Sequence, residues 1–240
     1  MKVLFTSSQP YTILLAKKMV KNGFIPTYFF TSSDTKSIIK KEFPDAIIHN
    51  YHNAIKGIPS EDLQEIELLP LEIEMLNYLS QYESIALSML DRNDSISDSF
   101  KHRERLDYYY QTLKYWYTVI LKLDIKLVYF EEEPHQANDY ILYLVTKYLN
   151  INTYMSVRTI SNLGIIPMKN FEKGSIPLIK LYNKNIEEYE NKKTLPKLSK
   201  HLDEYFKKIR GTYNDILSDH LWDQVEEYNN SIKKKKSETY

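Results

Sequence analysis

The first fifty residues show two patterns of hydrophobic and polar positions, one typical of strands and one typical of helices. Short apolar runs at residues 2–5, 24–30 and 45–50 suit buried strands, and the stretches between them carry apolar residues at helical spacing. The order strand, helix, strand, helix, strand is typical of a parallel sheet with right-handed crossovers. The pattern therefore predicts an α/β protein.

The middle of the chain is helical by the same test, and the strand pattern then resumes. Apolar positions recur every three or four residues over 71–90 and 100–121. A strand is expected at 126–130, a helix at 135–150 and a strand at 152–157. Together with the first fifty residues, this predicts a Rossmann-like open parallel sheet of about five strands with helices on both faces.

The strand and helix patterns weaken after Arg158. Residues 1–165 are expected to form the Rossmann-like α/β domain. Residues 166–198, which hold Gly174 and three prolines, are expected to form a loop or linker. Residues 199–240 are expected to form a C-terminal helical extension that ends in a disordered basic tail, because "KKKK" at 233–236 is a block of like charge.

Composition narrows the classes of function. The 240 residues are 42% hydrophobic and 27% charged, with a formal net charge of zero, which argues against a nucleic-acid partner. The absence of cysteine excludes disulfides, thiolate metal sites and a cysteine nucleophile. No uninterrupted apolar segment is long enough for a transmembrane span, and the start "MKVLFTSSQ" does not suit a signal peptide. We therefore expect a cytoplasmic protein.

Several common catalytic motifs are missing. The first turn between a strand and a helix, "TSSQPYT" at residues 6–12, has no glycine, so it is not a dinucleotide-binding loop and no NAD or FAD is expected. No P-loop, GxSxG elbow or HExxH motif occurs. One histidine near carboxylates also lacks the ligand spacing of a structural zinc site, so no metal is expected.

The stretch "VYFEEEPHQANDY" at residues 128–140 is the strongest candidate for a functional site. In an open parallel sheet, ligands bind outside the carboxyl ends of the strands, where residues 6–9, 131–136 and 158–161 are expected to converge. His135 and Asp139 are the candidate catalytic residues, because positions four apart lie about 40° from each other around a helix and can face one pocket. The expected substrate-binding residues are Ser7, Ser8, Gln9, Glu133, Gln136, Arg158 and Thr159.

The same stretch has a purely structural interpretation. The three glutamates then form a solvated turn, Pro134 starts the helix, and His135 pairs with a neighbouring carboxylate. Residue types alone leave both interpretations open.

The segment "EEEPHQANDYILYLVTKYLNINTY", with "LDR" and "RERLDYYY" before it, resembles the N-terminal half of GT-B-type glycosyltransferase-like proteins of bacterial surface and capsular polysaccharide biosynthesis. The resemblance covers about residues 1–165. It implies that this half binds the acceptor, that His135 acts as the base with Asp139 beside it, and that a second Rossmann domain binds the nucleotide sugar. The matching positions are Pro134, His135, Asp139, Arg158 and Thr159.

The chain departs from that family after residue 165, where no second alternating series of strands and helices follows. We expect sugar transfer from a nucleotide-sugar donor to a glycan acceptor. Either another chain supplies the donor domain, or the chain is a truncated or repurposed relative of the family. The alternative is a non-catalytic Rossmann-like binding or partner module, in which the helix at 199–232 docks another protein or a second copy. A third candidate is an unrelated α/β enzyme that acts on a phosphorylated small molecule.

Overall fold

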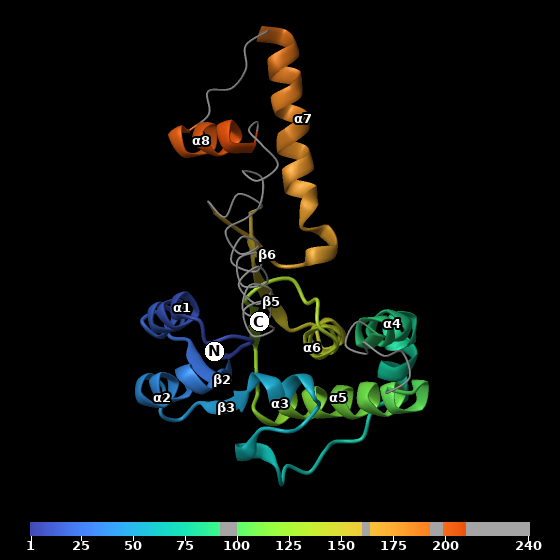
Figure 1. Cartoon of the computed structure of the whole chain (residues 1–240). Helices are drawn as coiled ribbons and strands as arrows, with labels where there is room; N and C mark the ends of the chain where they lie inside the picture. The colour runs from blue at the N-terminus through green and yellow to red at the C-terminus, as the bar shows by residue number, and fades with distance from the viewer. Residues whose placement is uncertain (92–99, 160–163, 193–198, 210–240) are drawn as a thin grey trace, which may run out of the picture. The chain divides into compact units, whose positions relative to one another are not determined.

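A computed structural model gives the structure of the chain (Figure 1). It describes residues 1–91, 100–159, 164–192 and 199–209. The chain divides into two compact units. The first unit contains Met1–Val157 and Pro167–Ser175, and the second contains Arg158–Ile166 and Ile176–Tyr240.

A six-stranded sheet with the order β3-β2-β1-β4-β5-β6 organises the fold. The β1–β2, β2–β3, β1–β4 and β4–β5 pairs are all parallel. The chain builds one side of the sheet outward from β1 and then returns to build the other side from β4, so the order reverses between β1 and β4. This is a Rossmann-like α/β fold, as the sequence predicted. The strands are β1 (Lys2–Phe5), β2 (Ile25–Thr31), β3 (Ile47–Asn50), β4 (Leu127–Phe130), β5 (Asn152–Arg158) and β6 (Ile165–Met168).

Helices cover both faces of this sheet (Figure 1). The helices of the first unit are α1 (Pro10–Val20), α2 (Ser33–Glu42), α3 (Tyr51–Ile55), α4 (Ile73–Asp91), α5 (His102–Lys122) and α6 (Ala137–Tyr148), with 3-10 turns η1 (Glu61–Leu63) and η2 (Phe171–Lys173). The helices α7 (Ser175–Lys192) and α8 (Lys200–Ile209) follow.

Alternate residues of each central strand enter two separate cores. Because successive side chains of a strand point to opposite faces, a strand buried on both sides is apolar throughout. Leu4, Tyr28, Phe30 and Val128 pack with α4, α5 and α6. Val3, Phe5, Phe29 and Tyr129 pack with α1 and α2 on the other face.

Three helices end in the same backbone conformation, after which the chain enters the next strand of the sheet. Gly23 after α1, Asp124 after α5 and Asn150 after α6 have positive φ angles of 79°, 56° and 54°. The residue after each donates its backbone N–H to the carbonyl five residues earlier, at 2.9–3.2 Å. This arrangement satisfies the last helical carbonyls, and Gly, Asn and Asp are the residues that accept the left-handed conformation most readily.

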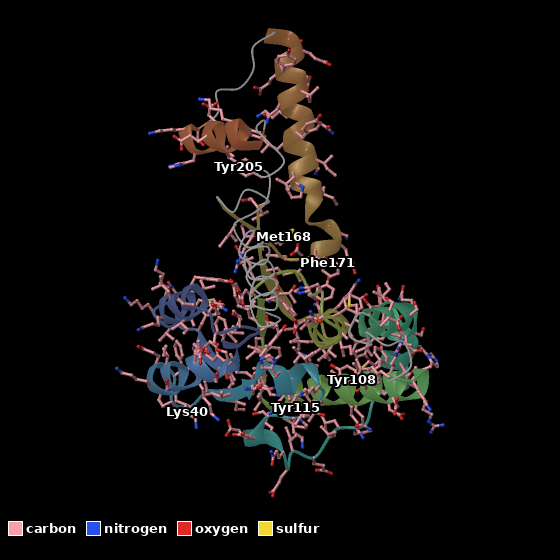
Figure 2. All side chains as sticks on the ribbon, in the orientation of Figure 1. Lys40, Tyr108, Tyr115, Met168, Phe171 and Tyr205 are labelled. Carbon is pink, nitrogen blue, oxygen red and sulfur yellow. The ribbon has the colours of Figure 1, made fainter. Side chains whose placement is uncertain are left out.

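The aromatic residues of α5 form packed core. Trp116 is fully buried and lies edge-on to Tyr28, with ring centroids 5.7 Å apart. Tyr115, labelled in Figure 2 with Tyr108 on the same helix, contacts the hydroxyl of Tyr28 at 2.9 Å and accepts a hydrogen bond from the backbone of Ser60. The stripe of apolar and aromatic positions in the sequence therefore marks the interior of the fold.

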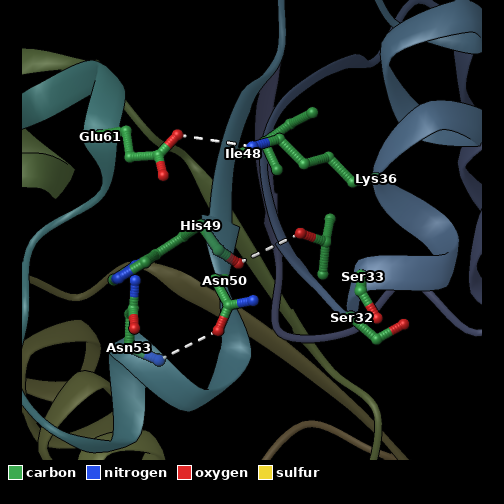
Figure 3. Close-up of a pocket in the computed structure, with 9 residues that line it drawn as sticks. Ser32, Ser33, Lys36, Ile48, His49, Asn50, Asn53 and Glu61 are labelled. Atoms are coloured by element: carbon green, nitrogen blue, oxygen red, sulfur yellow. Dashed lines mark hydrogen bonds and ion pairs between the residues drawn. The ribbon is translucent and has the colours of Figure 1, made fainter.

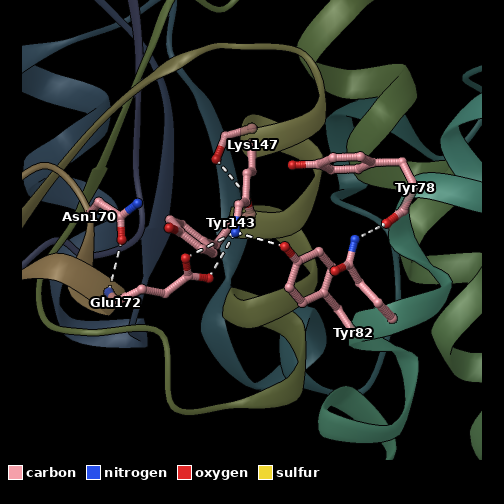
Figure 4. A network of polar contacts seen from close by, with 8 residues as sticks. Tyr78, Tyr82, Tyr143, Lys147, Asn170 and Glu172 are labelled. Carbon is pink, nitrogen blue, oxygen red and sulfur yellow. Dashed lines mark hydrogen bonds and ion pairs between the residues drawn. The ribbon is translucent and has the colours of Figure 1, made fainter.

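A polar network ties α6 to α4 and to η2 (Figure 4). Nζ of Lys147 donates to both carboxylate oxygens of Glu172, at 2.9 and 3.0 Å, and to the hydroxyl of Tyr82 at 3.0 Å. The same Nζ lies 4.6 Å from the centre of the Tyr82 ring. Burial lowers the pKa of Lys147, but its contacts with Tyr82 and Glu172 outweigh burial and raise the pKa above the ordinary value.

The structure after residue 165 differs from the predicted loop and helical extension. The expected linker at 166–198 contains the last residues of β6 and the helix α7, so the prediction of a loop over 175–192 was wrong. Gly174 precedes this helix and Pro177 lies in its first turn, where neither residue interrupts a helix. The predicted helix at 199–232 is observed as α8 over Lys200–Ile209, and the rest of it, with the basic run at 233–236, lies outside the described residues.

Candidate functional site

A pocket of about 200 Å³ opens at the carboxyl ends of β1, β2 and β4 in the first unit, where the strand order reverses. Ligands of open α/β sheets bind at this position, because the loops there diverge to opposite sides of the sheet. We call it the switch-point pocket. Its lining comes from residues 6–9 after β1, residues 30–32 at the end of β2, Tyr51 of α3, residues 130–132 at the end of β4, and Asp139 of α6.

The turn after β1 presents three buried hydroxyl residues, Thr6, Ser7 and Ser8. The backbone N–H of Thr6 donates to the carbonyl of Tyr129 at 3.0 Å, which continues the sheet ladder beyond β1. Oγ of Ser7 accepts from the backbone N–H of Gln9 at 3.1 Å. These contacts hold the expected binding residues Ser7, Ser8 and Gln9 along one wall of the pocket.

Glu131 is fixed against the same turn. Its backbone N–H donates to Oγ1 of Thr6 at 3.3 Å, and its carboxylate accepts a hydrogen bond from the hydroxyl of Tyr11 in α1. A carboxylate held in this way has a set orientation, and each of its oxygens can accept more than one hydrogen bond.

Asp139 lies in the first turn of α6 and is linked by hydrogen bonds, through the buried amide of Asn138, to the indole of Trp116. Nδ2 of Asn138 donates to Oδ1 of Asp139 at 3.3 Å, and Oδ1 of Asn138 accepts from the indole of Trp116 at 3.0 Å. The surrounding protein desolvates the carboxyl group, and Glu132 and Glu131 oppose its charge, so the pKa of Asp139 rises to about 7. Asn138 and His135 act in the opposite direction and only partly offset this rise. Near neutral pH, Asp139 can therefore both accept and release a proton.

Tyr51 faces the same set of carboxylates. Burial raises the pKa of Tyr51 to about 12, and the charges of Asp139, Glu132 and Glu131 contribute to the rise. Its hydroxyl therefore stays protonated at neutral pH and can donate to a ligand oxygen.

His135 does not share a helical face with Asp139, contrary to the prediction. The helix α6 begins at Ala137, because Gln136 has extended backbone angles and serves as the N-cap, its carbonyl accepting from the backbone of Tyr140 at 2.9 Å. His135 thus precedes the helix, and its side chain is 45% exposed and does not line the pocket. Its Nδ1 lies 3.1 Å from the carbonyl of Glu133 and 3.5 Å from the carboxylate of Glu132.

The other expected binding residues lie apart from the pocket lining or in the second unit. Glu133 and Gln136 flank His135 and do not line the pocket. Arg158 and Thr159 belong to the second unit. There, the backbone N–H and hydroxyl of Thr159 both donate to the carbonyl of Gly164, at 3.0 and 3.2 Å, in the turn between β5 and β6.

Tyr51 and residues 30–32 also line the pocket, although the sequence pattern did not single them out. Tyr51 comes directly after β3, and residues 30–32 lie at the end of β2. The rule that located residues 6–9 and 131–136 also applies to these two strand ends, and it could have found them.

A second, smaller pocket of about 180 Å³ shares Thr31 and Ser32 with the first and extends toward β3 (Figure 3). His49 is buried there between the hydroxyl of Tyr28, at 2.6 Å, and the carbonyl of Ile58, at 2.8 Å. Burial lowers the pKa of His49 to about 4, so it is neutral at physiological pH. We assign it a structural role, as its hydrogen-bonding positions are already satisfied.

Comparison of the chain with protein-family models, curated proteins and solved structures gave no match. In the described ranges, no group of three or more histidine or carboxylate side chains is arranged to hold a metal ion. None of the helices within those ranges has the length and apolar character needed to cross a membrane. The fold and the pocket define the chain as a Rossmann-like α/β protein with a polar pocket at its topological switch point.

Proposed function

We propose that the switch-point pocket binds a sugar acceptor and that Asp139 removes a proton from one of its hydroxyl groups during glycosyl transfer. The observation that carries this proposal is the carboxyl group of Asp139, with a pKa of about 7, in a pocket lined by hydroxyls and carboxylates. A general base works best when its pKa lies near the operating pH.

The lining suits a ligand rich in hydroxyl groups. The carboxylates of Glu131 and Glu132 accept hydrogen bonds, Tyr51 donates, and the serine and threonine hydroxyls do both. A sugar offers the complementary set, because each of its hydroxyls is both donor and acceptor. The described residues that line this pocket include no cation that would pair with a phosphate, so the lining favours the acceptor sugar over a phosphorylated substrate.

The size of the pocket sets the size of the ligand. Pockets that enclose drug-sized molecules measure about 300–1,000 Å³. A volume of about 200 Å³ is smaller and suits one sugar ring. The rest of a glycan would extend into solvent.

In the reaction we propose, the acceptor hydroxyl transfers its proton to Asp139 as its oxygen attacks the anomeric carbon of a nucleotide sugar. The new glycosidic C–O bond forms while the bond to the nucleoside diphosphate breaks, and the diphosphate leaves with the electron pair. The resemblance noted in the sequence assigns the donor to a second Rossmann domain. In this account, another chain supplies that domain.

The test is binding followed by transfer. Short glycans should bind to the wild-type protein and, with similar affinity, to Asp139→Asn, which keeps the shape of the side chain. Transfer measured with a partner domain should fall at least 100-fold in Asp139→Asn. Asp45→Asn, an exposed change outside the pocket, is the matched control. Failure of every sugar and glycan to bind would refute the proposal.

A non-catalytic partner module is the second candidate. It is favoured by the exposed apolar side chains of α7, which suit contact with another protein. In that case the pocket would bind a sugar without transferring it, and Asp139→Asn would change no reaction rate.

A further inference from the structure

The second pocket, of about 180 Å³, adjoins the switch-point pocket at the end of β2. Thr31 and Ser32 line both pockets. The hydroxyl of Thr35 in α2 contacts the hydroxyl of Ser8, which lines the switch-point pocket, and lies 3.2 Å from the hydroxyl of Ser32. These contacts tie the neighbouring walls of the two pockets together. A ligand that leaves the switch-point pocket past Thr31 and Ser32 would therefore enter the second pocket.

The two pockets differ in charge. The switch-point pocket has the carboxylates of Glu131 and Glu132 in its lining, and the described residues that line it include no cation. The lining of the second pocket includes Lys36 of α2. His49 is the other basic residue in that lining, and it is neutral because burial lowers its pKa to about 4. An anionic group would therefore be repelled in the switch-point pocket, whereas it can pair with Lys36 in the second pocket.

The side chain of Lys36 extends from α2 toward Glu61 of η1, which also lines the second pocket (Figure 3). Its Nζ lies 3.4 Å from Oε2 of Glu61, and the two side chains are 47% and 72% exposed. An ion pair this exposed contributes little to the stability of a fold. A ligand anion can therefore replace Glu61 as the partner of Lys36 without destabilising the first unit.

Asn50 supplies a hydrogen-bond donor in the same pocket. Its Oδ1 accepts from the backbone N–H of Asn53 at 3.2 Å, which orients the amide group. The amide nitrogen points away from Asn53 (Figure 3) and can donate to a ligand oxygen. Ser32 and Ser33 add hydroxyl groups to the lining. The second pocket thus combines one positive charge with uncharged donors and acceptors, which suits a sugar that carries one negative charge.

We propose that the second pocket binds a uronic acid of the acceptor, which is joined to the ring in the switch-point pocket and pairs its carboxylate with Lys36. This inference rests on the proposed function, because it adds one ring to the same acceptor. The second pocket is close in volume to the first and suits one ring. A carboxylate is favoured over a phosphate monoester, because one lysine balances one negative charge and Glu61 would repel a second.

Calorimetric binding of matched disaccharides to the full chain tests this assignment. The probes are disaccharides that contain glucuronic or galacturonic acid, each paired with the neutral disaccharide in which the carboxyl group is reduced to an alcohol. The best acidic disaccharide should bind about 10-fold more tightly than its neutral counterpart, which is the effect of one charge-assisted hydrogen bond. Lys36→Met should abolish this preference and leave the affinity for the neutral disaccharide unchanged. Lys40→Met, an exposed change on the same helix (labelled in Figure 2) and outside both pockets, is the matched control and should keep the preference.

Replacing Glu61 gives a second test, in which affinity should rise. Glu61→Gln removes the carboxylate that competes for Lys36, so the acidic disaccharide should bind about 3-fold more tightly, while the affinity for the neutral one stays the same. Glu65→Gln, another exposed change outside the pocket, is the matched control. All four positions are exposed, so the variants should unfold at the same temperature as the wild type.

Neutral sugars distinguish a failure of this inference from a failure of the proposed function. If neutral sugars bind and no acidic disaccharide binds more tightly than its neutral counterpart, the uronic acid site is overturned and the proposed function stands. A preference for the acidic disaccharide that survives in Lys36→Met would also overturn the site. The same holds for tighter binding of a disaccharide that carries a phosphate monoester in place of the carboxylate. If no sugar of any kind binds, the proposed function itself fails, and the uronic acid site fails with it.

Discussion

The indole Nε1 of Trp116 donates a 3.0 Å hydrogen bond to Oδ1 of Asn138, which joins the interior of α5 to the first turn of α6. Both residues are buried. The amide of Asn138 is thereby oriented so that its nitrogen donates to Asp139. A core residue thus sets the position of the amide that contacts the candidate base.

Replacing Asn138 should both destabilise the fold and raise the pKa of Asp139. Asn138→Leu leaves the buried indole N–H of Trp116 without a partner, which should cost about 1–3 kcal/mol of unfolding free energy in urea titrations. It also removes a hydrogen bond that lowers the pKa of Asp139, so that pKa should rise further. Asn53→Leu, which changes a half-buried amide outside this chain of contacts, should not alter the pKa of Asp139.

The contribution of Asp139 to stability should fall as the pH rises from about 4 toward 7, whereas His49, whose pKa burial lowers to about 4, acts in the opposite direction below about pH 6.5. The folded pKa of Asp139 is about 7, and that of an unfolded aspartate is about 3.9. Between these values the native state binds a proton at Asp139 that the unfolded state has lost, so the contribution of Asp139 to the free energy of unfolding decreases with pH. The decrease from this group is at most about 4 kcal/mol. Asp139→Asn should remove it, whereas equal pH slopes in the two proteins would contradict the assignment.

Substitution of His135 should lower the rate of sugar transfer much less than substitution of Asp139. His135 is exposed and outside the pocket lining, so His135→Ala should fold normally and lower the transfer rate less than 10-fold. Transfer by the wild-type protein should rise with pH through about 7 as Asp139 loses its proton. A greater loss in His135→Ala than in Asp139→Asn would assign the base to the histidine.

The polar network around Lys147 should contribute measurably to the stability of the first unit. Lys147→Met removes two hydrogen bonds to Glu172 and one to Tyr82, and we expect a loss of about 1–3 kcal/mol in unfolding free energy. A double-mutant cycle with Glu172→Gln isolates the coupling between the two charges. Additive effects of the two changes would show that the pair contributes nothing.

Much of the fold was predictable because its signals are local. Apolar runs at residues 2–5, 24–30, 45–50, 126–130 and 152–157 identified β1 to β5. The helix α7 was missed because Gly174 and Pro177 were counted as evidence against a helix, although both lie at its start. Glycine and proline interrupt a helix only in its interior.

The sequence predicted where the candidate site lies, but not which side chains face each other in it or how their pKa values are shifted. The strand-end rule located residues 6–9 and 131–132 of the pocket lining, since it depends only on the parallel topology. The prediction that His135 and Asp139 share a helix face was wrong, because α6 begins at Ala137, two residues later than expected. His135 still lies near enough to lower the pKa of Asp139. The raised pKa of Asp139 depends on burial by distant segments, which no local pattern reveals.

The most direct test of the account is a pH titration of the side-chain carboxyl carbon of Asp139 by NMR, assigned with Asp139→Asn. We predict a midpoint near 7, which should move when a short glycan binds. A midpoint near the ordinary aspartate value of about 3.9 would contradict the claim that this pocket holds a base.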